Sequence, residues 1–132
     1  MEKIRVKINK AVMANKVYLG NDGYIHHVYD GDQTYSILQK DVEQIVELLK
    51  QRRGEKKPAK VLGDHTKIGK ADSSARKAAS EAIKNGDYDK LALFGTNVFH
   101  TVAANLIILA SGRSKKVKVF KTRSKAIIWL EK

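Results

Sequence analysis

The segment Lys90-Leu91-Ala92-Leu93-Phe94-Gly95 decides the fold, because it has the composition of a strand buried in the middle of a sheet. A short apolar run bounded by turn signals is typical of such a strand. Helical patterns flank it on both sides. Small apolar residues repeat at helical spacing over residues 73–85, and residues 98–111 are apolar nearly all round. We therefore expect this second helix to be covered on more than one side.

The alternation of strands and helices continues in both directions from this segment. Towards the C-terminus, residues 116–120 are predicted to form a strand, and Thr122 is predicted to cap a last helix. Towards the N-terminus, a strand over residues 58–64 is predicted to follow a helix between Asp41 and Arg53. Asp41 is expected in the first turn of that helix, where the helix dipole stabilises a negative charge. Alternating units of this kind build a parallel sheet covered by helices.

The first part of the chain adds strands of another kind. Residues 4–8 alternate apolar and polar side chains, as in a half-buried strand. Residues 16–19 and 24–29 are predicted to form an antiparallel hairpin, because residues 20–23 between them (Gly-Asn-Asp-Gly) tolerate the positive φ of tight turns. The sequence therefore predicts one α/β domain over residues 1–132, with a mixed β-sheet and an N-terminal antiparallel hairpin followed by the order α-β-α-β-α-β-α.

Three segments, taken in order, carry a family resemblance. They are Val61-Leu62-Gly63-Asp64 with Ala71-Asp72-Ser73-Ser74-Ala75, then Asp89-Lys90-Leu91-Ala92-Leu93-Phe94-Gly95, then Val117-Lys118-Val119-Phe120-Lys121-Thr122 with the helix of Ala126 to Leu130. The ordered set resembles the STAS domain, the fold of anti-sigma factor antagonists and of the cytoplasmic tails of sulfate transporters. Small stand-alone proteins of the STAS or Sec14-like type are the most similar members. The resemblance covers residues 61–132 by segment and the preceding part by element order alone.

This resemblance implies a regulatory, non-enzymatic protein-interaction module. In the family the second serine of the motif is the phosphoacceptor, which by match is Ser74, with Ser73 as the neighbouring candidate. Asp64, Asp72 and Arg76 are implied as residues of the switch loop that contacts a protein partner, such as a kinase or another regulator. A helix N-terminus stabilises an added phosphate, which makes such a site physically reasonable. The alternative is that Asp72 or Ser73 only caps the helix, the ordinary role of these residue types.

Catalysis, metals and cofactors are not expected. Asp64 and His65 in a loop after a strand could form an acid–base pair, but no nucleophile, oxyanion donor or third orienting group accompanies them. His26 and His27 are adjacent in a strand and should point to opposite faces. The chain has no Cys, which excludes thiolate chemistry. Residues 63–71 lack the spacing and the hydroxyl of a P-loop, and we interpret them as a flexible basic loop able to contact an anion.

The formal net charge of +12 favours acidic partners. The basic residues form two clusters, interpreted either as an anion-binding patch or as solvated faces: Arg52, Arg53, Lys56 and Lys57, and then Arg113, Lys115, Lys116, Lys118, Lys121 and Arg123.

Two alternative functions stay open. One is a nucleic-acid binder, whose affinity would fall steeply with salt. The other is a binder of a small apolar or anionic ligand, a lipid or a nucleotide, as in Sec14-type relatives. That alternative predicts an apolar cavity beside the helix of residues 98–111. The helix itself could also serve as a dimer surface.

Targeting signals are not expected either. The N-terminal residues alternate charged and apolar side chains, whereas a signal peptide needs an uninterrupted apolar stretch of roughly 7–15 residues. The longest apolar region, residues 98–110, is shorter than the roughly 20 residues of a membrane-spanning helix. The sequence therefore predicts a cytoplasmic protein without a transmembrane segment.

Overall fold

The computed structural model describes residues 14–132, so the strand expected over residues 4–8 lies outside the described residues. The elements follow one another in the order β1 (Lys16–Leu19), β2 (Ile25–Gln33), α2 (Tyr35–Gly54), β3 (Lys60–Ala71), α3 (Ser73–Asn85), β4 (Lys90–Phe94), α4 (Val98–Ser111), β5 (Val117–Phe120) and α5 (Arg123–Glu131). The predicted α/β class and element order are confirmed.

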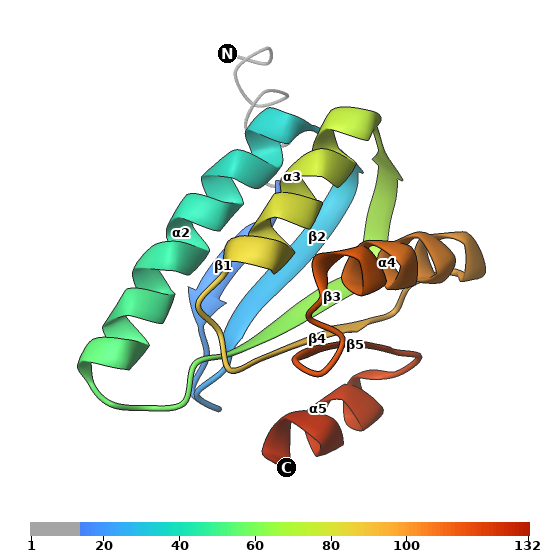
Figure 1. Cartoon of the computed structure of the whole chain (residues 1–132). Helices are drawn as coiled ribbons and strands as arrows, with labels where there is room; N and C mark the ends of the chain where they lie inside the picture. Colours follow the sequence, from blue (N-terminus) through green and yellow to red (C-terminus); the bar gives the residue numbers. More distant parts are fainter. Residues whose placement is uncertain (1–13) are drawn as a thin grey trace, which may run out of the picture.

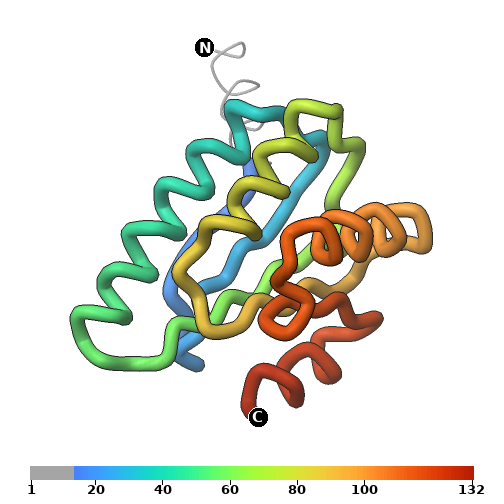
Figure 2. The backbone as a smooth tube through the Cα atoms, in the orientation of Figure 1, coloured from blue at the N-terminus to red at the C-terminus, as the bar shows by residue number. Residues whose placement is uncertain are grey.

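The five strands form one mixed sheet in the order β1-β2-β3-β4-β5. β1 pairs antiparallel with β2, as predicted for the hairpin, and the remaining pairs are parallel. Figure 1 shows α2, α3 and α4 on one face of this sheet and α5 on the other. Helices α2 and α3 lie side by side, whereas α4 lies across the layer at a large angle to them (Figure 2).

Alternation along the strands sends neighbouring side chains into two separate cores. Ile25 and Val61 pack with Leu49 of α2, Ile83 of α3 and Ile108 of α4. The residues next to them point the other way, where Leu62 packs with α5 residues Ala126 and Leu130. Because both faces are covered, the central strands are apolar on both sides, which is the pattern that identified residues 90–95.

Strand β3 is longer than predicted. β4 pairs with it only as far as Asp64, but β3 continues to Ala71 in a two-stranded ribbon with β2. The expected loop over residues 63–71 is therefore wrong, because the segment pairs with β2. Gly69 fits this pairing, since a Cβ there would lie 2.9 Å from the carbonyl carbon of Gly31. The ribbon of β2 and β3 therefore extends past the end of β4, and α3 begins directly after it, at Ser73.

Two helices also differ from their predictions. α2 begins at Tyr35, where the side chain of Thr34 accepts a hydrogen bond from the backbone N–H of Ile37. Asp41 is therefore the seventh residue of the helix and buried, so its predicted place in the first turn is wrong. α4 has the predicted bounds, but it is not covered on several sides, and only Ile108 is buried. Ile107 is partly buried against the same core, and the other large apolar side chains are exposed, from Val102 at 55% through Leu106, Leu109 and Val98 to Phe99 at 85%.

The remaining helix boundaries agree with the local signals in the sequence. Asp72, Asn97 and Thr122 cap α3, α4 and α5, each accepting a hydrogen bond from a backbone N–H three residues on. Within residues 14–132 no helix has the length and apolar character needed to cross a membrane.

Candidate functional site

A cavity of about 240 Å³ lies between the sheet and helices α2, α3 and α4. Most of its wall is apolar. Helix α2 contributes large side chains such as Leu38 and Ile45, whereas α3 and α4 contribute small ones, including Ala79, Ala103 and Ala104. The cavity is partly open to solvent, and concave sites with a mostly apolar wall are few in any one protein.

Polar side chains reach the cavity from four different elements. They are His27, Tyr29 and Gln33 of β2, His65 of β3, Arg76 of α3 and His100 of α4. His27, Tyr29 and His65 form a row of rings, with centroids 4.0 Å apart for the first pair and 4.4 Å for the second. The cavity therefore combines an apolar wall with one cluster of hydrogen-bonding groups.

Two nitrogen atoms of this cluster have no partner. His65 Nε2 and His100 Nδ1 are buried and form no hydrogen bond with any residue in the described part of the chain. Burial, reinforced by the neighbouring imidazoles of His27 and His100, lowers the pKa of His65 to about 4. His65 is therefore neutral at pH 7, with one ring nitrogen able to accept a hydrogen bond and the other able to donate one. Burial also raises the pKa of Tyr29, which keeps its phenol neutral.

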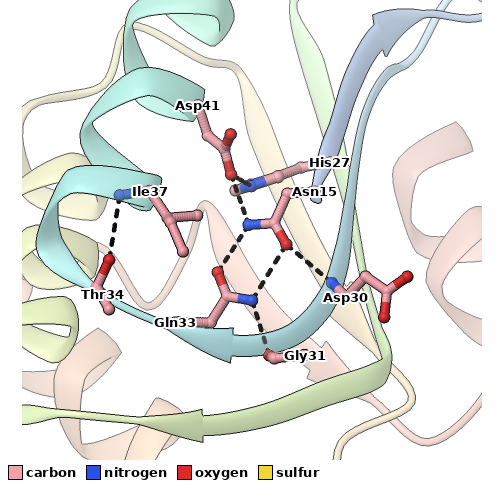
Figure 3. A network of polar contacts seen from close by, with 8 residues as sticks. All are labelled: Asn15, His27, Asp30, Gly31, Gln33, Thr34, Ile37 and Asp41. Carbon is pink, nitrogen blue, oxygen red and sulfur yellow. Dashed lines mark hydrogen bonds and ion pairs between the residues drawn. The ribbon is translucent and has the colours of Figure 1, made fainter. Parts of the chain in front are cut away.

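The third imidazole is fixed by a buried polar network (Figure 3). His27 Nε2 lies 2.7 Å from Asp41 Oδ2. Asn15 donates through Nδ2 to the same oxygen and to Gln33 Oε1, each at 2.7 Å. Gln33 returns a hydrogen bond from Nε2 to Asn15 Oδ1 at 3.1 Å. The network joins β2 and α2, and it sets the orientation of His27 at the cavity wall.

The serines proposed from the sequence lie outside this cavity, at the start of α3. Asp72 caps the helix and accepts hydrogen bonds from the Ala75 N–H and from Ser74 Oγ, both at 2.7 Å. The Ser74 hydroxyl, followed by the Ala75 N–H, lowers the pKa of Asp72. Ser73 and Ser74 are both exposed. Arg76 is the one residue of this group that also reaches the cavity, while its Nη1 donates to the carbonyl of Ala71.

Asp64 and His65 do not form the acid–base pair considered above. They are neighbours in β3 and point to opposite faces, so His65 faces the cavity while Asp64 does not. Asp64 Oδ1 instead accepts hydrogen bonds from the backbone N–H and the hydroxyl of Thr66. His26 and His27 also diverge, as predicted, because His26 bonds to Asp22 on the far side of the sheet.

The basic clusters are partly used inside the fold. In the first cluster Arg53 pairs with Asp89 at 2.9 Å, and Arg52 donates to the carbonyl of Pro58. In the second cluster Arg113 donates to the carbonyl of Gly86 and lies over the ring of Tyr88. The exposed members are Arg53, Lys56 and Lys57 of the first cluster and Lys115, Lys116, Lys118, Lys121 and Arg123 of the second.

The architecture is that of the SpoIIAA-like fold, an α/β class of protein. It matches a crystal structure of an uncharacterized protein of the DUF3478 family from Shewanella loihica PV-4, described as having that fold, with a TM-score of 0.58 and 20% identity over 89% of this chain and 92% of that chain. A family model for a domain of unknown function, DUF7793, matches residues 18–132, and the chain belongs to that family. No curated protein matches the chain significantly.

Sequence reasoning did not find the histidine cluster. His27, His65 and His100 are far apart in the sequence and come from three elements. The sequence does contain two signals for the cluster. His100 interrupts an otherwise apolar helix, and His65 follows the apolar part of a strand. The predicted apolar cavity beside residues 98–111, in contrast, is present.

Proposed function

We propose that the protein binds a small, largely apolar molecule in the cavity between the sheet and α2, α3 and α4. The observation that carries this proposal is an apolar cavity of about 240 Å³ with two unpartnered imidazole nitrogens in its wall. An apolar wall with a few placed polar groups is the usual composition of a small-molecule site. The activity proposed is binding and release, without chemistry.

The apolar wall of the cavity supports an occupant. The cavity is partly open to solvent and its wall is mostly apolar, so without a ligand these side chains face water. An apolar ligand removes that surface from water, which contributes roughly 25 cal/mol per Å² of apolar area buried.

The volume also sets the size of the ligand. An engineered cavity of about 150 Å³ holds one benzene molecule, which has six non-hydrogen atoms. By proportion, a cavity of about 240 Å³ holds a molecule of about ten non-hydrogen atoms. A medium-length alkyl chain or a bicyclic aromatic molecule fits this description.

Naphthalene is a suitable neutral probe, since it has ten carbon atoms and no polar group. At ten times its dissociation constant it should stabilise the folded state by about 1.4 kcal/mol, which raises Tm by roughly 4 °C. Ala104→Phe places a large ring at the cavity wall and should abolish this rise. Ala110→Phe, on the exposed part of the same helix, is the matched control and should keep it. An equal rise in Ala104→Phe would refute the proposal, as would a parent protein that binds neither naphthalene nor an eight-carbon acid or amide.

A phosphorylation switch is the second candidate function, and the STAS-like character of the fold favours it. Ser74 is exposed in the first turn of α3, where a phosphate would meet the positive end of the helix. Phosphorylation would also remove the O–H that Ser74 donates to Asp72, and the added charge of about −1.5 to −2 would repel that carboxylate. Such a change would alter the surface that a partner protein contacts.

Mass spectrometry of the protein from its native cells tests whether Ser74 is modified. Pull-downs with Ser74→Ala and Ser74→Asp then test its consequence, with Ser80→Ala in the second half of α3 as the matched control. The switch predicts a partner that distinguishes the Ser74 variants from each other. Identical partners for both Ser74 variants would exclude the switch and leave the cavity proposal untouched.

A further inference from the structure

The unpartnered nitrogens of His65 and His100 define the polar end of the cavity. His65 Nε2 lies on β3 and His100 Nδ1 on α4, and both are shielded from solvent. Burying a polar atom without a hydrogen bond is unfavourable, and native proteins rarely leave one without a reason. Two such atoms on facing elements indicate that the occupant of the cavity supplies a group that bonds to both.

The charges around these atoms favour an acidic group. Three histidines and Arg76 are among the residues that line the cavity, and no Asp or Glu of residues 14–132 belongs to its wall. Asp41, the nearest buried carboxylate behind the wall, is already bonded to His27 and Asn15. A cationic head group would find no carboxylate in this wall, whereas an anionic one would meet imidazole N–H donors.

Resting on the proposed function, we propose that the cavity binds an apolar carboxylic acid whose carboxyl group bridges His65 and His100, and that the complex holds one more proton than the free protein and the free carboxylate. The two oxygens of one carboxyl group are suited to two separate nitrogens. A hydroxyl could also bond to both nitrogens, because it donates one hydrogen bond and accepts two, but it brings no negative charge to favour the bound proton. The extra proton comes from solvent and is shared within the imidazole–carboxyl cluster.

Every charged or titratable group that faces His65 is consistent with this proton uptake. β2 presents His27 and Tyr29, α3 presents Arg76, and α4 presents His100. Asp64, the preceding residue of β3, is the one anion that acts on the ring, and burial together with His27 and His100 outweighs it, so the pKa of His65 stays low and the ring is neutral. A carboxylate inside the cavity would add a second negative charge, on the buried side of the ring, which favours the protonated cluster.

Octanoate and octanamide are matched probes, since each has an eight-carbon chain and ten non-hydrogen atoms. We expect octanoate to bind at least roughly tenfold more tightly than octanamide at about pH 6. Its dissociation constant should rise roughly tenfold per pH unit between about pH 5.5 and 7, because one proton is taken up on binding. Titration calorimetry in buffers of different ionisation enthalpy counts that proton directly. Octanamide should show neither effect.

Variants of the two histidines locate the head group. His65→Phe keeps an aromatic ring beside Tyr29 and should reduce octanoate affinity to that of octanamide and remove the pH dependence. His100→Phe is a second variant with the same expectation. His26→Phe is the matched control, because His26 is a histidine of the neighbouring strand β2 that lies on the opposite face of the sheet and bonds to Asp22. It should leave octanoate binding unchanged.

The outcomes separate this inference from the proposal on which it rests. If naphthalene binds but octanoate is no better than octanamide, the cavity is a binding site and the carboxyl assignment is wrong. Octanoate binding that persists unchanged in both His65→Phe and His100→Phe would also overturn the assignment. If none of the three probes binds, the proposed function itself fails.

Discussion

The buried network around Asp41 gives the sharpest test of how the cavity wall is held in place. Asp41 is 6% exposed, and its Oδ2 atom is 2.7 Å from both His27 Nε2 and Asn15 Nδ2. Asp41→Leu removes both bonds and leaves His27, itself 5% exposed, without its partner. Hydrogen bonds to a charged group contribute about 1.5–3 kcal/mol each, and removing one member of a buried pair costs about 3–5 kcal/mol. Because the leucine gains some apolar burial, we expect a net loss of about 3 kcal/mol.

Equilibrium unfolding in urea, followed by circular dichroism, measures this loss as a shift of the midpoint at constant slope. Asp41→Asn keeps one oxygen that can accept from Asn15 or His27, and we expect it to cost about 1 kcal/mol. The double variant His27→Phe with Asp41→Leu removes both polar partners and should be more stable than Asp41→Leu alone. If Asp41→Leu unfolds within about 0.5 kcal/mol of the parent protein, the network does not contribute as argued.

Three further predictions address the core, a turn and the pH dependence. Leu62 is 1% exposed, so Leu62→Ala should lower the free energy of unfolding by about 2–5 kcal/mol. Leu109 is 71% exposed, so Leu109→Ala should change it by no more than about 0.5 kcal/mol. Urea unfolding compares the two variants. Gly95→Ala should destabilise the protein by at least about 1 kcal/mol, because Gly95 has φ +83° and a Cβ there would lie 3.1 Å from a backbone nitrogen of β3; the same assay measures it. Burial, and then the hydrogen bond to the Glu131 carboxylate, raise the pKa of Tyr24 to about 12. Since the unfolded value is about 10, this stabilisation is complete below about pH 10 and is lost as pH rises towards 12. Unfolding series at rising alkaline pH should show that loss, and Tyr24→Phe should flatten it.

The helices that the sequence predicted best are those with signals at both ends. Residues 73–85 and 98–111 were predicted with the bounds that the structure has. Asp72 and Asn97 cap their starts, and a glycine follows the end of each. Capping and termination depend on a few adjacent residues, so they are visible without any knowledge of the tertiary structure.

The features that the sequence did not predict depend on distant residues. β3 runs past Asp64 because it pairs with β2, and the two strands are separated by the whole of α2. Its outer half carries exposed residues such as Lys67 and Lys70, so it has no apolar alternation to reveal it. The composition of α4 indicated burial, but composition does not say how many neighbours a helix has, and α4 exposes most of its apolar side chains.

The cavity shows the same limit at the level of the site. The alanines of α3 were interpreted as residues that let the helix lie close to its neighbours, and for Ala75 and Ala78 that holds, since both are buried against α2. Ala79 and Ala82, one turn further on, instead line the cavity together with Ala103 and Ala104 of α4. A small side chain permits close approach only where a neighbour arrives to use the space. α4 lies across the layer (Figure 1), and the cavity lies next to it, between α4, α3 and the sheet. Whether this space is a ligand site therefore depends on the placement of α4, and for that reason a substitution on that helix is the decisive test.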